Sequence, residues 1–196
     1  MPRLTVTACL LSAVLVGLPP VASAEESVPE WLTRSRELAQ QLATELKAEL
    51  QRSLASGGPV AAIAVCRNRA PEIAAGLSEG SGALVSRTAL KVRNPANAPD
   101  ELQRAVLEQF AGDLASGRYE MPLEAAVEIN RAGRIERRYM RAIPMEGMCV
   151  ACHGPVLAPE ISAAVATSYP QDQATGFEPG QLRGAISVTW RAGGER

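Results

Sequence analysis

The run Cys149-Val150-Ala151-Cys152-His153 constrains this 196-residue chain more than any other feature. A C-x-x-C-H run is the attachment signal for c-type haem. The two thiols form thioether bonds to the haem vinyl groups, and the histidine reaches the iron from the proximal side. His153 is the only histidine in the sequence. If the run holds haem, one axial ligand is therefore fixed and the other is not a histidine.

Two other kinds of site share the C-x-x-C spacing. A structural zinc site takes four Cys or His ligands, and Cys66 is the one candidate left to join Cys149, Cys152 and His153. A dithiol redox pair normally lies where a strand runs into a helix, whereas Gly154-Pro155 follows this motif and disfavours a helix start. The sequence favours haem, and a zinc-stabilised binding module is an alternative.

The N-terminus has the pattern of a secretory signal peptide. Arg3 precedes an apolar run from Leu4 to Leu18, and Ala22-Ser23-Ala24 is an A-x-A cleavage site. The run is shorter than the roughly 20 residues needed to span a bilayer. We therefore expect cleavage after Ala24, a periplasmic product and no stable membrane insertion afterwards. Export supports the haem interpretation, because c-type haem is attached outside the cytoplasm.

Charge and cysteine count narrow the function further. The net charge of −1 becomes −2 when Arg3 is removed with residues 1–24. This charge, without a cluster of base-stacking aromatic residues, gives no support for nucleic acid as a partner.

Cys66 has no disulfide partner once the C-x-x-C pair holds haem, so it is either a buried inert thiol or an iron ligand. Met121 and Met140 are rival ligands, whereas Met145 and Met148 lie too near Cys149 to reach the opposite haem face.

Residues 25–196 fit a single domain. Patterning and turn residues predict two N-terminal helices: one begins with a capping box at Ser27 to Glu30 and runs to about Leu54, where Gly57-Gly58-Pro59 stops it, and the second covers residues 60–73 and is broken or kinked by Pro71 just after Cys66. A strand over Ala83 to Arg93 follows, and then a helix that is capped by Asn97 and ends near Ser116. The rest of the chain is predicted to form a hairpin of Leu123 to Ile129 and Arg134 to Ile143, a helix over Pro159 to Ser168 and a strand over Ala185 to Trp190. Helices followed by antiparallel strands with helical insertions indicate an α+β fold.

Five arginines lie on or beside the predicted hairpin: Arg131, Arg134, Arg137, Arg138 and Arg141. Most are expected to face solvent. Two functional alternatives are pairing with haem propionates, which suits bidentate arginine geometry, and docking of an acidic redox partner.

Five stretches together resemble one known family. They are Ala64-Val65-Cys66-Arg67 with Ala70-Pro71-Glu72-Ile73; Leu90 to Asp100 (LKVRNPANAPD); Cys149 to Gly154 (CVACHG); Tyr169 to Phe177 (YPQDQATGF); and Gly180 to Val188 (GQLRGAISV). In order and type they resemble the single-haem c-type proteins with a PAS-like domain, long catalogued as a domain of unknown function. The haem motif alone is generic, whereas the combination is specific and covers nearly the whole of residues 25–196.

The resemblance implies a PAS-like antiparallel sheet with N-terminal helices and helical insertions, cradling one covalent haem c. It also implies that His153 is the proximal ligand and Cys66 the second axial ligand. A six-coordinate haem has no open site for substrate, so we expect no enzyme activity. We expect an exported cytochrome for electron transfer or redox sensing, working with a separate redox partner protein. A haem-based sensor of CO or NO is an alternative, because a thiolate ligand can dissociate and open a site.

Overall fold

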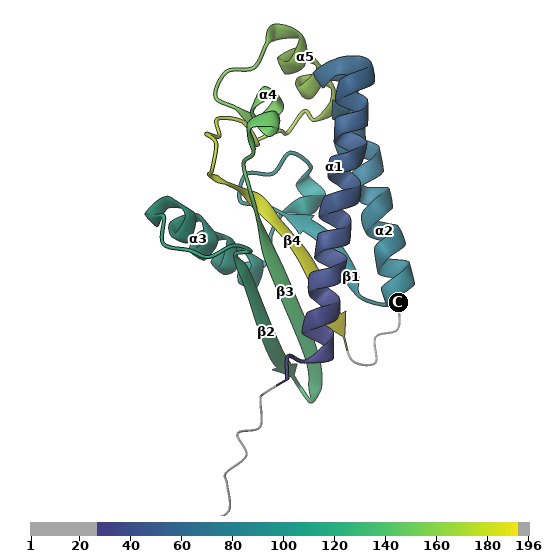
Figure 1. Cartoon of the computed structure of the whole chain (residues 1–196), viewed down its shortest axis with the longest axis vertical. Coiled ribbons are helices and arrows are strands. Elements are labelled where there is room, and N and C mark those ends of the chain that lie inside the picture. Colours follow the sequence, from purple (N-terminus) through teal and green to yellow (C-terminus); the bar gives the residue numbers. More distant parts are fainter. Residues whose placement is uncertain (1–26, 192–196) are drawn as a thin grey trace, which may run out of the picture.

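The structure is a computed structural model that describes residues 27–191. The predicted signal peptide and its cleavage site lie outside the described residues. The elements, most of which Figure 1 labels, are α1 (Glu30–Ala64), the π-helical turn η1 (Val65–Arg69), α2 (Ala70–Ser81), β1 (Leu84–Thr88), the 3-10 turn η2 (Pro95–Asn97), α3 (Glu101–Ser116), β2 (Glu124–Arg131), β3 (Arg134–Pro144), the 3-10 turn η3 (Gly147–Cys149), α4 (Val150–His153), α5 (Pro159–Ser168) and β4 (Leu182–Arg191). None of the helices described is long and apolar enough to cross a membrane.

Four antiparallel strands form one sheet in the order β1-β4-β3-β2. The hairpin of β2 and β3 turns through Ala132 and Gly133, whose φ angles are 51° and 83°. Two consecutive positive φ angles are typical of a type I′ turn, whose twist matches that of the flanking strands. The C-terminal strand β4 fills the centre of the sheet, between β1 and β3. The predicted α+β class and the predicted hairpin are confirmed.

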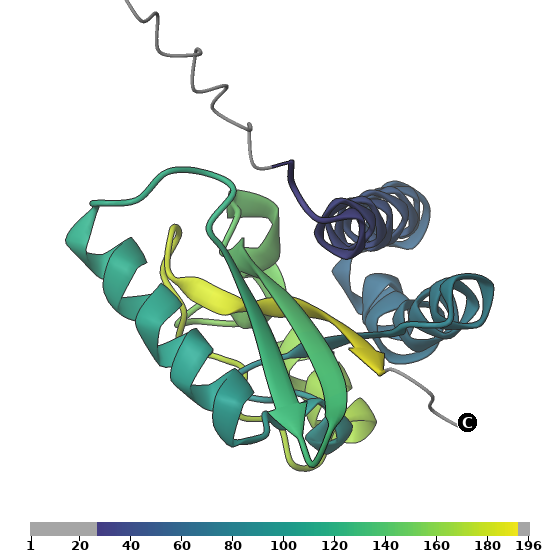
Figure 2. The same ribbon diagram turned by 90° about the horizontal axis from the view of Figure 1, so that it is seen from below.

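Helices cover both faces of this sheet, as Figure 2 shows. On one face, α1 and α2 pack Leu38, Leu42 and Ala74 against Tyr139 and the strand residues around it. On the other face, α3 packs a stripe of Val106, Leu107 and Phe110. Neighbouring residues of β3 divide between the two cores, since Tyr139 belongs to the first and Met140 to the second. This alternation is the period of two that a strand buried on both faces requires.

The predicted helix stop at residues 57–59 is a sharp break inside α1. Gly58 has φ 71° and ψ −173°, a conformation that only glycine adopts readily, and Pro59 follows it. The chain then resumes as a helix toward Cys66. Pro71 has no N–H to donate to the carbonyl of Arg67, and the chain forms the π turn η1 here, in which the N–H of Ala70 donates to the carbonyl of Val65. The predicted distortion by Pro71 is thus present as a π turn.

Three local predictions are wrong. The N-cap of α1 is Pro29, without a side-chain hydrogen bond, so no capping box forms at Ser27. The cap of α3 is Asp100, which forms a reciprocal capping box with Gln103, whereas the predicted cap Asn97 belongs to the preceding turn η2. The strand predicted to reach residue 93 ends at Thr88, where the pairing of β1 with β4 ends.

Candidate functional site

A cavity lies between the N-terminal helices, one end of the sheet and the segment that carries the C-x-x-C-H motif. It contains about 1080 Å³ free of protein atoms, including the part open to solvent. Four residues singled out in the sequence line it together: Cys66, Cys149, Cys152 and His153. Its walls are otherwise largely apolar, with Leu46, Leu50, Leu54, Ile63 and Ile143 among the lining residues. An apolar cavity with a few convergent polar groups suits a flat, largely apolar cofactor such as haem.

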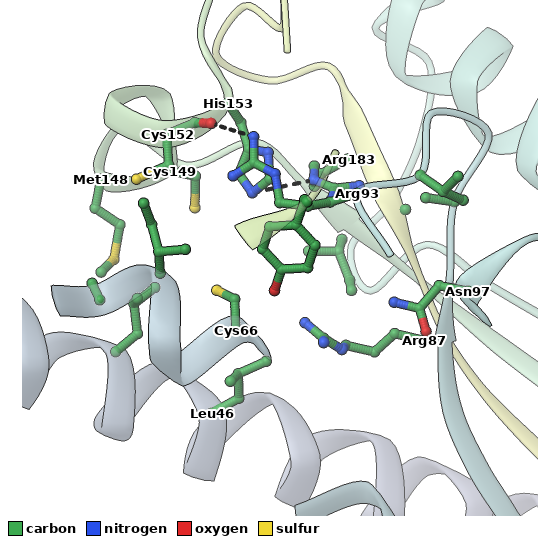
Figure 3. A pocket seen from close by; sticks show the side chains of 18 of the residues that line it. Leu46, Cys66, Arg87, Arg93, Asn97, Met148, Cys149, Cys152, His153 and Arg183 are labelled. Atoms are coloured by element: carbon green, nitrogen blue, oxygen red, sulfur yellow. Dashed lines mark hydrogen bonds between the residues drawn. The ribbon is translucent and has the colours of Figure 1, made fainter. Parts of the chain in front are cut away.

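The π turn η1 places Cys66. Its side chain points into the cavity from the helical side, and His153 points in from the opposite side (Figure 3). π turns inside helices are frequent at functional sites, because the wider turn re-aims the side chains within it. The distortion that the sequence predicted from Pro71 therefore includes Cys66, whose thiol enters the cavity. The two arginines next to Cys66 in the sequence do not line the cavity: Arg67 is exposed, and Arg69 pairs with Glu49 and Glu72.

The short helix α4 carries Cys152 and His153, with Cys149 as its N-cap. It ends at Gly154, where an added Cβ would lie 2.5 Å from the carbonyl oxygen of Val150, so a larger residue does not fit without movement. The 174–177 segment holds this turn from outside: the N–H of Phe177 donates to the carbonyl of His153 at 3.0 Å. The turn thus presents both thiols and the imidazole to one cavity.

Hydrogen bonding defines the state of His153. Its Nδ1 lies 2.7 Å from the carbonyl oxygen of Ala174, which can only accept, so Nδ1 carries the proton. Burial, and then the cations of Arg183 and Arg93, lower the pKa of His153 to about 3. The imidazole is therefore neutral near pH 7, with the lone pair on Nε2. A neutral imidazole whose other nitrogen donates to a backbone carbonyl is the usual form of a metal-binding histidine.

Arg93 holds the motif and the carbonyl behind His153 in place. Its guanidinium donates to both carboxylate oxygens of Asp172, at 3.0 and 3.2 Å. It also donates to the carbonyl of Cys152 at 2.6 Å and to that of Ala174 at 3.2 Å. Asp172 in turn accepts the N–H of Ala174 at 2.9 Å. The side chains of the pair are only 7% and 10% exposed, so this charged pair fixes the backbone around the candidate proximal ligand.

The two motif thiols do not have the properties of a redox-active pair. Burial is the main cause that raises the pKa of both Cys149 and Cys152, whereas a reactive dithiol needs a depressed pKa. The zinc alternative also lacks geometric support. Across residues 27–191, no three Cys, His, Asp or Glu side chains are gathered closely enough to hold a metal ion.

The prediction of Met121 and Met140 as rival axial ligands is wrong. Met121 is 55% exposed, Met140 is buried under α3, and neither lines the cavity. Met148, which was expected to lie too near Cys149, does line the cavity.

The propionate role suggested for the hairpin arginines is also wrong for Arg134, Arg137, Arg138 and Arg141, none of which lines the cavity. Arg137 and Arg138 pair with acidic side chains instead, and Arg141 donates to Gln40.

Sequence reasoning gave no role to four charged residues that matter here: Arg87, Arg93, Asp172 and Arg183. Three of them fall within the quoted family stretches, but nothing in the local pattern distinguishes a buried arginine from an exposed one.

Comparisons with known proteins give a family and a similar solved structure. The model of the Tll0287-like family matches residues 23–190. Among solved structures, the chain is similar to the crystal structure of the cyanobacterial heme-protein Tll0287, with 27% identity and a TM-score of 0.64 over 84% of this chain and 96% of that one. A search of curated proteins gives no match. The structural similarity confirms the predicted PAS-like α+β fold.

Proposed function

The chain belongs to the Tll0287-like family, and from this premise we propose that it is an exported monohaem c-type cytochrome. The similar solved structure is that of a cyanobacterial heme-protein, which supports haem binding here. The observation that carries the proposal is local. Cys66, from the π turn, and Cys149, Cys152 and His153, from the motif segment, line one cavity although more than 80 residues of chain separate them.

Each residue has a distinct task in this proposal. Cys149 and Cys152 anchor the haem, each by adding its S–H across a vinyl C=C bond, so that a C–S bond forms and no atom is lost. His153 binds the iron through Nε2, since its Nδ1 donates to Ala174. Cys66 enters the cavity from the opposite side and binds as the second axial ligand. The raised pKa of the two motif thiols is compatible with this role, because they serve as anchors rather than as a redox pair.

We assign electron transfer or redox sensing to this site rather than catalysis. When bound, the haem supplies one-electron chemistry at iron. With both axial positions taken by His153 and Cys66, no position remains for a substrate. A thiolate ligand donates charge and favours ferric iron, so the reduction potential is expected to be low beside that of a His/Met cytochrome. Electrons would pass to and from a separate redox partner protein.

The compartment follows from the same chemistry. Haem attachment to C-x-x-C-H takes place outside the cytoplasm, and residues 1–24 have the pattern of a cleaved signal peptide. We therefore place the mature protein in the periplasm, starting at Glu25. N-terminal sequencing of the exported protein should begin at that residue, and a product that retains Met1 contradicts the assignment.

Haem staining after a denaturing gel tests the proposal. The full chain is produced together with the haem-attachment machinery. The parent should retain haem under denaturing conditions, and a Cys149→Ala/Cys152→Ala variant should lose it. A colourless parent, or stain that survives the double substitution, contradicts covalent attachment at these residues.

A further inference from the structure

Three arginines make part of the cavity wall strongly positive. Arg87 from β1, Arg93 from the segment after β1 and Arg183 from β4 all line the cavity. Arg93 is paired with Asp172. For Arg87 and Arg183, no carboxylate within residues 27–191 lies at ion-pair distance. Three guanidinium groups thus face one carboxylate, which leaves two positive charges.

These two charges are in an unfavourable environment. Burial lowers the pKa of Arg87. Burial, followed by repulsion from Arg93 and Arg87, lowers the pKa of Arg183 to about 10. Charges in a partly buried site require compensation by opposite charge. A site that keeps two uncompensated arginines in an apolar cavity is therefore suited to an anion with two negative groups.

The bonds that Arg183 makes are weak enough to exchange. Its Nε donates to Nε2 of His153 at 3.5 Å and its Nη1 donates to the carbonyl of Lys91 at 3.3 Å, both longer than a normal N–H···O or N–H···N bond. Nε2 of His153 is the atom assigned to the iron. Arg183 would give up that contact when the site is filled, and its guanidinium would then be free to turn to a carboxylate.

We propose that Arg87 and Arg183 bind the two propionate groups of the haem, an inference that rests on the proposed function. The thioether bonds fix the vinyl-bearing edge of the porphyrin at Cys149 and Cys152, and the propionates lie on the opposite edge of the ring. Figure 3 shows Cys149 and Cys152 on one side of the cavity and both arginines on the other side, Arg183 next to His153 and Arg87 beyond Cys66. Two propionates match the two uncompensated charges, and the guanidinium fork matches carboxylate geometry.

The reduction potential of the covalent holoprotein gives the first test. Removing a cation beside the haem disfavours the reduced state, which carries less positive charge. Arg87→Gln and Arg183→Gln should each lower the equilibrium constant for reduction by on the order of tenfold, equal to a fall of about 59 mV for one electron. Arg87→Lys and Arg183→Lys keep the charge and should retain most of the potential. Arg137→Gln is the matched control, because it removes a half-exposed cation that does not line the cavity. Potentials equal to that of the control in both Gln variants overturn the proposal.

A second test identifies the groups that the arginines touch. The full chain with Cys149→Ser and Cys152→Ser is titrated with haemin and with haemin dimethyl ester, which lacks the propionate charges. Each Arg→Gln change should weaken haemin binding by about tenfold or more and leave binding of the ester unchanged. An equal loss for both compounds would show that the arginines act elsewhere, for example on Cys66, and overturns the assignment, as does no loss for either.

Failure of the proposed function itself would look different. In that case the parent protein would not stain for haem. The Cys149→Ser/Cys152→Ser variant, with all arginines unchanged, would bind neither haemin nor haemin dimethyl ester. That result overturns the haem proposal and the propionate contacts together. If the parent stains for haem but the Arg→Gln variants keep its reduction potential and its haemin affinity, only the propionate contacts are overturned.

Discussion

Replacing Arg93 by methionine should destabilise the protein far more than any exposed arginine substitution. The change removes two hydrogen bonds to Asp172 and those to the carbonyls of Cys152 and Ala174, while Asp172 stays 10% exposed. Breaking a buried pair by removing one partner costs about 3–5 kcal/mol, because the other charge is left uncompensated. For a domain of this size, that lowers the melting temperature by about 6–20 °C, at about 2–4 °C per kcal/mol.

The stability lost in Arg93→Met should depend on pH. Burial alone would raise the pKa of Asp172, but the hydrogen bonds from Arg93 and from the N–H of Ala174 lower it below its ordinary value. In the parent, the stabilisation from the pair is therefore present above about pH 4 and is lost as the pH falls through the depressed pKa. Arg93→Met removes the hydrogen bonds and the charge of Arg93 that lower the pKa of Asp172, so that pKa rises. The difference in unfolding free energy between parent and variant should be greatest near pH 7 and shrink toward pH 4.

Urea unfolding of the holoprotein at several pH values measures this difference. Arg137→Met is the matched control, since its pair with Glu128 is exposed and worth at most about 1 kcal/mol. An Arg93→Met/Asp172→Asn variant should be more stable than Arg93→Met, because it leaves no buried carboxylate. A loss in Arg93→Met no larger than in the control, or one that does not change with pH, would refute the reasoning.

Three further substitutions test how the fold holds the site, each by urea unfolding. Gly184→Ala places a Cβ 2.4 Å from the carbonyl oxygen of Thr88 and should cost about 1–3 kcal/mol through overpacking at the cavity wall; no loss would mean that the two strands can separate freely. Asp100→Ala removes the cap of α3 and also the ion pair with the buried Arg138, and should cost at least about 1–2 kcal/mol; an unchanged midpoint would contradict the cap. Gly58→Ala should cost about 1–3 kcal/mol from backbone strain alone, since nothing lies within 4 Å of the added Cβ. Gly76→Ala is its control, with equal free space but an ordinary helical backbone, and equal effects of the two would contradict the strain argument.

Much of the fold was predictable because its signals are local. The helix α5 begins and ends at the predicted residues, and α3 ends at Ser116 as predicted. The long predicted strand failed for a tertiary reason: Leu90 and Val92 alternate as strand residues do, but Leu90 packs under α3 and Val92 lines the cavity, beyond the end of the β1–β4 pairing. Alternation reports which side chains are buried and not what buries them.

The candidate site also has one part that the sequence predicts and one part that it does not. Cys149, Cys152 and His153 are adjacent in the chain, so their grouping in space follows from the motif. Cys66 was linked to them by its lack of a partner and by the resemblance. The rest depends on long-range folding: Arg93 meets Asp172 across 79 residues, and no periodicity connects them. The wrong choice of Met121 and Met140 has the same origin, because reach along the chain does not show which face of the sheet a side chain occupies.

Iron bound between His153 and Cys66 is the centre of the proposed function, and Cys66→Met tests it most directly. The measurement is the ferric optical spectrum together with the reduction potential of covalent holoprotein, for the parent, Cys66→Met and Cys66→Ala. We predict thiolate-to-iron charge-transfer bands in the parent, their loss in both variants, and a potential raised toward that of ordinary His/Met cytochromes in Cys66→Met. An unchanged spectrum and potential in both variants would contradict the central claim and direct attention to Met148.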